Sequence, residues 1–105
     1  MPIKTIAAEA RFSSEKMAKT NLFGTERFFC DVYGLEPGQS QKPHTHEGAD
    51  KIYCVVSGTA RVRIGEEDAL VGEGAIAHVP AGAEHSVENP GPGRATLLVF
   101  MAPRP

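Results

Sequence analysis

The 105-residue sequence contains no tryptophan, and aromatic residues make up only 7% of it. No apolar stretch approaches the roughly 20 residues that a membrane-spanning helix requires. Lysine and arginine are scattered and the formal net charge is −2, so there is no basic patch of the kind that binds nucleic acid or an anionic membrane surface. We therefore expect neither a membrane protein nor a nucleic-acid-binding protein.

Cysteine is also scarce. Cys30 and Cys54 are 24 residues apart, and each lies within an apolar run. This placement favours two buried thiols in a reducing compartment, whereas the alternative, a disulfide, would require export. The first residues, Met1 to Thr5, lack the apolar core of a secretory signal, so we expect a cytoplasmic protein.

Glycine and proline, in contrast, are abundant, with eleven and eight residues. They separate short apolar runs, a pattern typical of an all-β chain with a single domain. Alternating, aromatic and β-branched residues predict strands over 27–35, 51–56, 60–64, 69–71, 75–79, 86–88 and 95–101. Residues 1–26 carry less signal, and the segment 13–19 fits either a helical turn or a loop.

Three of the four histidines carry the candidate chemistry. His44 and His46 precede a predicted strand, and side chains two residues apart in an extended chain point to the same side. Neutral imidazole is the commonest metal ligand, but two solvated loop histidines would also explain this pair. His85, in its own turn rich in glycine and proline, adds a third candidate ligand. We expect His78 to be a surface or satisfied strand histidine, with a pocket-facing acid–base role as the alternative.

The spacing of these histidines among the glycines resembles the cupin family. Gly38, five residues and then His44-Thr45-His46 are similar to the start of the first cupin motif. The second motif, G-x5-P-x-G-x2-H-x3-N, is matched in full by Gly74, Pro80, Gly82, His85 and Asn89. The two motifs and the segment between them span residues 38–89, and the match is to small single-domain cupins.

This resemblance implies one domain over residues 1–105, an RmlC-like antiparallel β-barrel or double-sheet jelly roll. It also implies an N-terminal segment, 1–25, that can exchange strands between subunits. Inside the barrel it places one divalent metal ion, bound by the two motif-one histidines, a motif-one glutamate and the motif-two histidine. Asn89 is then a turn residue, and turns that need a positive φ or a close backbone approach are expected at Gly38, Gly58, Gly74 and Gly82.

The sequence departs from the family at the glutamate, where it has Asp50 or, with a spacer longer by one residue, Lys51. Asp50 shares a strand face with three apolar side chains, Ile52, Cys54 and Val56. Lys51 shares the other face with Tyr53 and Val55. Because the first face is the more apolar, we expect it to be the interior, with Asp50 as the fourth metal ligand. Two alternatives stay open. The side chain of Asp50 is shorter than that of glutamate and can fall short, which leaves a site of three histidines alone, or the strand has the opposite register and Lys51 faces the site. We expect Glu47, beside His46, to be a solvated loop carboxylate.

The resemblance leaves two kinds of function open. One is a metal-dependent enzyme, dioxygenase-like or isomerase-like, with iron, manganese, nickel or zinc bound by His44, His46, Asp50 and His85. The other is a non-catalytic module that binds a small molecule or a metal. The strand 95–101 is apolar on both faces, so one side needs cover from outside the barrel, and we expect a homodimer.

Overall fold

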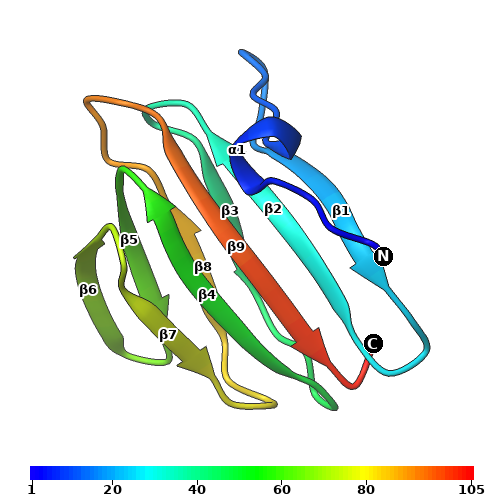
Figure 1. The fold of residues 1–105 in the computed structure, drawn as a ribbon. Coiled ribbons are helices and arrows are strands. Elements are labelled where there is room, and N and C mark those ends of the chain that lie inside the picture. The colour runs from blue at the N-terminus through cyan, green and yellow to red at the C-terminus, as the bar shows by residue number, and fades with distance from the viewer.

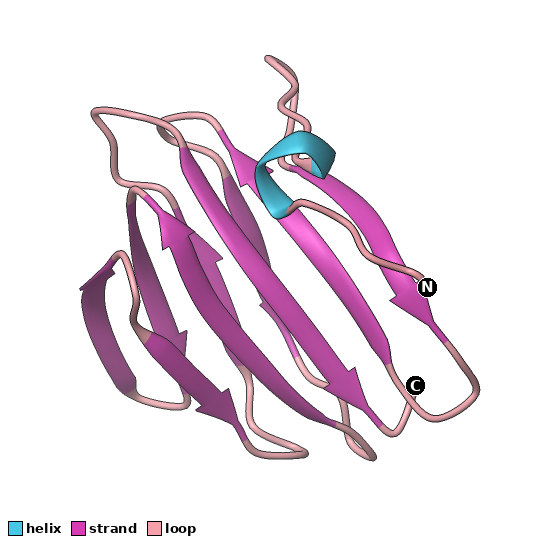
Figure 2. Cartoon of the chain, in the orientation of Figure 1, coloured by secondary structure: helices cyan, strands magenta, loops and turns pink.

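Nine antiparallel strands follow a single helical turn in the computed structural model, which describes all residues from 1 to 105. The elements, shown in Figures 1 and 2, are α1 (Ile6–Glu9), β1 (Ala18–Gly24), β2 (Phe29–Leu35), β3 (Ser40–His44), β4 (Asp50–Ser57), β5 (Thr59–Ile64), β6 (Glu67–Gly72), β7 (Ile76–Val79), β8 (His85–Glu88) and β9 (Ala95–Ala102). No helix has the length and hydropathy that crossing a bilayer would require.

The strands form two sheets. One has the order β1-β2-β9-β4-β7 and faces the viewer in Figure 1, while the other, β3-β8-β5-β6, lies behind it. In both sheets a late strand is inserted between two early ones, since β9 separates β2 from β4 and β8 separates β3 from β5. The predicted all-β double-sheet jelly roll is therefore confirmed.

The core lies between the sheets and is built by alternate residues of their strands. Tyr53 and Val55 of β4 pair with Val99 and Leu97 of β9, and all four side chains are buried. Val87 of the second sheet packs against the same cluster. Burial of one such aliphatic side chain contributes roughly 1.5–3 kcal/mol, so this layer is a main source of the fold's stability.

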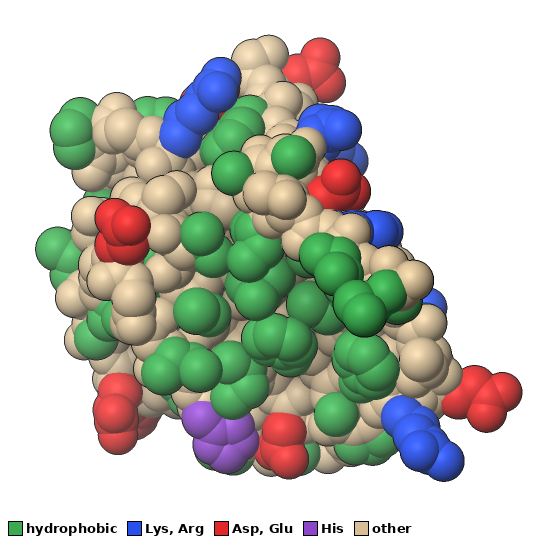
Figure 3. Space-filling model, viewed as in Figure 1, with side chains coloured by type: hydrophobic (Ala, Val, Ile, Leu, Met, Phe, Trp, Pro, Cys, Tyr) green, Lys and Arg blue, Asp and Glu red, His purple; other side chains and the backbone are tan.

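The predicted interior face of β4 is wrong. Lys51, Tyr53 and Val55 point inward and are buried, whereas Asp50 and Ile52 lie on the outer face. The more apolar face of β4 is thus its outer face, and the five-stranded sheet as a whole carries apolar side chains on its outside as well as on its inside. Figure 3 shows this outer face, with hydrophobic side chains gathered over its middle and charged ones around its margin.

Two strands were not predicted, β1 and β3. Both are edge strands, one in each sheet. The residues of β3 are Ser-Gln-Lys-Pro-His, in which apolar and polar side chains do not alternate. They also contain a proline, which within a sheet only an edge strand tolerates. In β1 Lys19 and Asn21, which pair with Tyr33 and Asp31 of β2, are polar and exposed, so the period-2 signal of a half-buried strand is weak there. For the segment 13–19 the sequence fitted either a helical turn or a loop. In the structure the part of it that precedes β1 is a loop with a bend.

The four turn glycines follow the expectation, and of the two cysteines expected to be buried one is. Gly38, Gly58, Gly74 and Gly82 all have positive φ. Gly58, between β4 and β5, also requires a small residue, because an added Cβ would lie 2.3 Å from the carbonyl oxygen of Arg94. Both cysteines are free, Cys30 buried and Cys54 partly buried.

The N-terminal segment packs on the outside of β1 and β2. Ile6 of α1 contacts a small cluster formed by Leu22, Cys30 and Val32, and Figure 1 shows α1 in front of these strands. In the single chain β1 pairs with β2 of the same molecule.

Candidate functional site

The three predicted histidines come together at one end of the barrel. His44 is the last residue of β3 and lies opposite His85, the first residue of β8, in the antiparallel pair. Their ring centroids are 4.1 Å apart, and that of His46 is 4.9 Å from His44 and 5.7 Å from His85. One ring nitrogen from each lies within 4.8 Å of the other two. The structure thus brings together His44, His46 and His85, from two strands and a loop.

Backbone carbonyls orient two of these rings. Nδ1 of His44 lies 2.8 Å from the carbonyl oxygen of Lys42, and Nδ1 of His85 lies 3.0 Å from that of Ala83. A carbonyl only accepts hydrogen bonds, so Nδ1 must carry the proton in each ring. Nε2 of each ring is then unprotonated and its lone pair faces the interior, which is the tautomer that a metal ligand needs.

Lys51 occupies the space that these lone pairs face. Its side chain is 1% exposed, and Nζ lies 3.3 Å from Nε2 of His44, from Nε2 of His85 and from Oε1 of Gln41. An ammonium group has three N–H donors, and here it finds three acceptors. The tyrosine rings of Tyr53 and Tyr33 add cation–π contacts, at 5.0 and 5.7 Å from Nζ to the ring centroids.

Burial and mutual repulsion lower the pKa values of the basic groups in this site. Burial, with help from the charge of Lys19, lowers the pKa of Lys51 to about 8, against the opposing pull of Asp31. Burial is also the largest cause that lowers the pKa of His85 to about 4, with Lys51 acting in the same direction and the bond to Ala83 opposing it. The pKa values of His44 and His46 are lowered too, again mainly by burial. The histidines are therefore neutral near pH 7.

Asp50 does not lie with the histidines, because its strand has the opposite register to the one expected. Its carboxylate is on the outer face, where Oδ1 accepts the backbone N–H of Ala81 at 3.0 Å and lies 3.4 Å from Nε2 of His78. Asp50 thus fixes the turn after β7. His78 is an exposed strand histidine, as expected, and Glu47 is exposed in the loop.

The sequence offered Lys51 only as the alternative to Asp50, and it gave no sign of Gln41. Besides the bond to Lys51, Oε1 of Gln41 accepts from the Tyr53 hydroxyl at 3.4 Å, and its Nε2 donates to the Tyr33 hydroxyl at 3.3 Å. The longer spacer in the first motif does point to Lys51. No motif singles out Gln41, which lies in a strand without an apolar pattern.

Comparisons with known proteins agree with this architecture. The family model described as a cupin domain matches residues 31–101. The chain belongs to the cupin family. This cupin is 50% identical to the TT1209 protein of Thermus thermophilus, whose crystal structure it matches over 100% of both chains with a TM-score of 0.97.

Two further matches widen the comparison. An uncharacterised protein of Streptomyces coelicolor is 38% identical to this cupin over 74 residues, which are 69% of this chain and 68% of that protein. A Klebsiella pneumoniae protein described as having a double-stranded β-helix domain is 24% identical and has a TM-score of 0.91, over 98% of this chain and 90% of that one. At this identity the second match bears on the fold alone.

The donor chemistry of the histidine cluster is consistent with a divalent metal ion. Imidazole nitrogen suits zinc, iron and nickel, whereas manganese prefers oxygen ligands, and the cluster contains no carboxylate. The unusual feature is Lys51, whose ammonium group is hydrogen-bonded to two of the three donors. A metal ion at these histidines would have to displace that group, since both carry positive charge and share the same lone pairs.

Proposed function

We propose that this cupin binds one divalent metal ion through His44, His46 and His85 and uses it to act on a small molecule in the barrel. The observation that carries the proposal is the fixed tautomer of two converging rings. Backbone carbonyls hold Nδ1–H of His44 and His85, so that both Nε2 lone pairs point at one space. A solvated pair of loop histidines would need no such bonds.

A site of three histidines leaves coordination positions for a substrate. When bound, the metal would supply Lewis-acid catalysis of the isomerase type or a place for dioxygen in dioxygenase-like chemistry. The chain itself would supply Gln41 and Lys51, an amide and a cation that are held together at 3.3 Å. Displaced from the histidines, the Lys51 ammonium can donate to an oxygen of the substrate and orient it.

A second candidate is a metal-free binding module. The arrangement of Lys51 favours it, because three acceptors already satisfy the ammonium group without a metal ion. In this case Lys51 is the permanent positive centre of the barrel, and the histidines are its hydrogen-bond acceptors. The protein then binds a small molecule without turnover.

Metal titration separates the two candidates. Protein purified without added metal is stripped, and zinc, iron(II) and nickel are titrated in, with metal per chain measured by elemental analysis. We expect one equivalent per chain, lost in His85→Ala. The matched control is His78→Ala, because His78 is exposed and lies outside the cluster.

Each outcome assigns one candidate. One equivalent that depends on His85 and not on His78 supports the metal site, and oxygen uptake by the iron form with a panel of small molecules then tests for dioxygenase-like activity. No binding by the parent protein, or equal binding by His85→Ala, would overturn the metal proposal and leave the metal-free module.

A further inference from the structure

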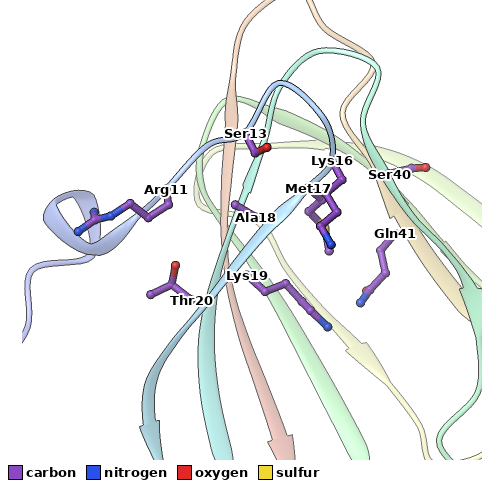
Figure 4. A pocket seen from close by; sticks show the side chains of 9 residues that line it. All are labelled: Arg11, Ser13, Lys16, Met17, Ala18, Lys19, Thr20, Ser40 and Gln41. Atoms are coloured by element: carbon purple, nitrogen blue, oxygen red, sulfur yellow. The ribbon is translucent and has the colours of Figure 1, made fainter.

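A cavity of about 660 Å³ opens between the free edges of the two sheets. One wall comes from β1 and the segment before it, and the other from the start of β3. Figure 4 shows its lining residues: Arg11, Ser13, Lys16, Met17, Ala18, Lys19, Thr20, Ser40 and Gln41. A volume of this size holds a small metabolite, for which pockets typically measure about 300–1,000 Å³.

The cavity is positively charged. Lys16 and Lys19 point into the same space as Gln41 in Figure 4, and no aspartate or glutamate lines the cavity. Neither lysine takes part in an ion pair, whereas Arg61 and Arg94 do. Arg11 points away, because its guanidinium donates to the carbonyl oxygens of Ala8 and Ala10. The two lysine charges are therefore free to meet a ligand.

Gln41 joins this cavity to the histidine site. It lines the cavity, and its Oε1 is 3.3 Å from Nζ of Lys51, which in turn is 3.3 Å from Nε2 of His44 and of His85. The carboxylate of Asp31, on the neighbouring strand β2, is hydrogen-bonded to the side chain of Asn21.

We propose that the ligand of this cupin is a small organic anion, held in the cavity by Lys16 and Lys19 with the rest of the molecule directed past Gln41 toward the histidines. Carboxylates and phosphate esters share the anionic oxygens that two ammonium groups recognise. This proposal rests on the proposed function only for the chemistry that follows at the histidines. The anion-binding step itself needs only the lysines.

Binding is tested on the metal-free protein, so its outcome is independent of the metal proposal. Succinate, its neutral analogue succinamide and inorganic phosphate are each titrated and followed by backbone NMR shifts. We expect succinate or phosphate to shift the amides of β1 and β3, and succinamide to leave them unchanged. Lys19→Met should lower the affinity for the anion by about fivefold, as the loss of one exposed ion pair does. The double variant Lys16→Met/Lys19→Met should lower it by roughly twentyfold.

The matched control is Arg27→Met, which removes one positive charge from an exposed turn outside the cavity. A preference for succinate identifies a carboxylate ligand, and a preference for phosphate identifies a phosphorylated one. Either supports the proposal if Arg27→Met changes the affinity less than twofold. Equal binding of succinamide, no anion binding, or equal losses in Lys19→Met and Arg27→Met would each overturn it, whatever the metal titration shows.

Discussion

Lys51 is one of the two positions at which the first motif would have its glutamate, and its ammonium group, beside the histidines, sets the electrostatics of the site. A glutamate would add negative charge beside a metal ion, whereas Lys51 adds positive charge 3.3 Å from two of the donors. A metal ion must therefore compete with a cation that belongs to the chain itself. The strength of this competition can be measured at single residues.

Lys51→Met should tighten metal binding. Methionine keeps most of the buried volume but removes the charge and the donors, so we expect an affinity gain of about tenfold, equivalent to roughly 1.4 kcal/mol. Asp50→Asn is the matched control at the neighbouring position, and it should change the affinity less than twofold because Asp50 lies on the outer face. Calorimetric titration of zinc into both variants, with melting curves to verify folding, gives the answer. A strong loss in Asp50→Asn with no gain in Lys51→Met would contradict the observed register.

The low pKa of His85 predicts a pH dependence of stability in the metal-free protein. In the unfolded chain this imidazole takes up a proton below about pH 6.5, but in the folded protein only below about 4. Between these values the unfolded state binds more protons, so the free energy of unfolding falls as the pH falls. Melting temperatures measured from about pH 7 to about pH 4 should therefore decline less steeply in His85→Gln. Parallel curves for the two proteins would show that His85 protonates equally in both states.

At the scale of elements, the loop after β8 is held by one side chain. Asn89 is 1% exposed, and its Nδ2 donates to the carbonyl oxygens of Leu35 and Gly93 at 2.9 and 2.8 Å. Its Oδ1 accepts the N–H of Gly91 at 2.8 Å. The motif asparagine is thus a turn residue, as expected, and it ties this loop to the end of β2.

Asn89→Ala should lower the free energy of unfolding by about 3 kcal/mol, since it removes three hydrogen bonds and leaves buried groups without partners. Asn21→Ala is the comparison, because Asn21 is exposed and its amide bonds are made at the surface, where the cost is below about 1 kcal/mol. Urea unfolding of the two variants provides both values. Similar small losses would mean that water replaces Asn89 in the loop.

The spacing of the motif residues and the alternation of apolar and polar residues predict some of the strands and site residues but not others. The histidines and Asn89 follow from residue spacing, because a turn with a fixed number of residues brings the same atoms to the same place. β5 and β9 follow from alternation and apolar runs. The register of β4 does not follow, because both of its faces are apolar and the interior end of the barrel holds the polar site, with Lys51 buried there. Edge strands such as β3 escape prediction because their side chains face solvent or the site.

At the scale of the whole molecule, the outer face of the five-stranded sheet carries exposed apolar side chains. Strands β9, β4 and β7 present apolar side chains that neighbour one another in the register: Ile52, Cys54, Ile76, Leu98 and Phe100. Ile76 is 69% exposed and Phe100 is 37% exposed. A contiguous apolar patch with a charged margin, as in Figure 3, is typical of a protein–protein interface.

We predict that a second copy of the chain covers this face. Two such patches are self-complementary around a two-fold axis, which is the commonest symmetry of soluble oligomers. Light scattering at micromolar concentration should then give twice the chain mass of 11.2 kDa. Phe100→Glu buries a charge in this interface and should give monomers, whereas Leu70→Glu, at a 58% exposed position of β6 in the other sheet, should stay dimeric. A dimer that survives Phe100→Glu would instead point to contacts elsewhere, such as an exchanged N-terminal segment 1–25. A mass of 11.2 kDa for the parent protein would show that it is a monomer and overturn the prediction.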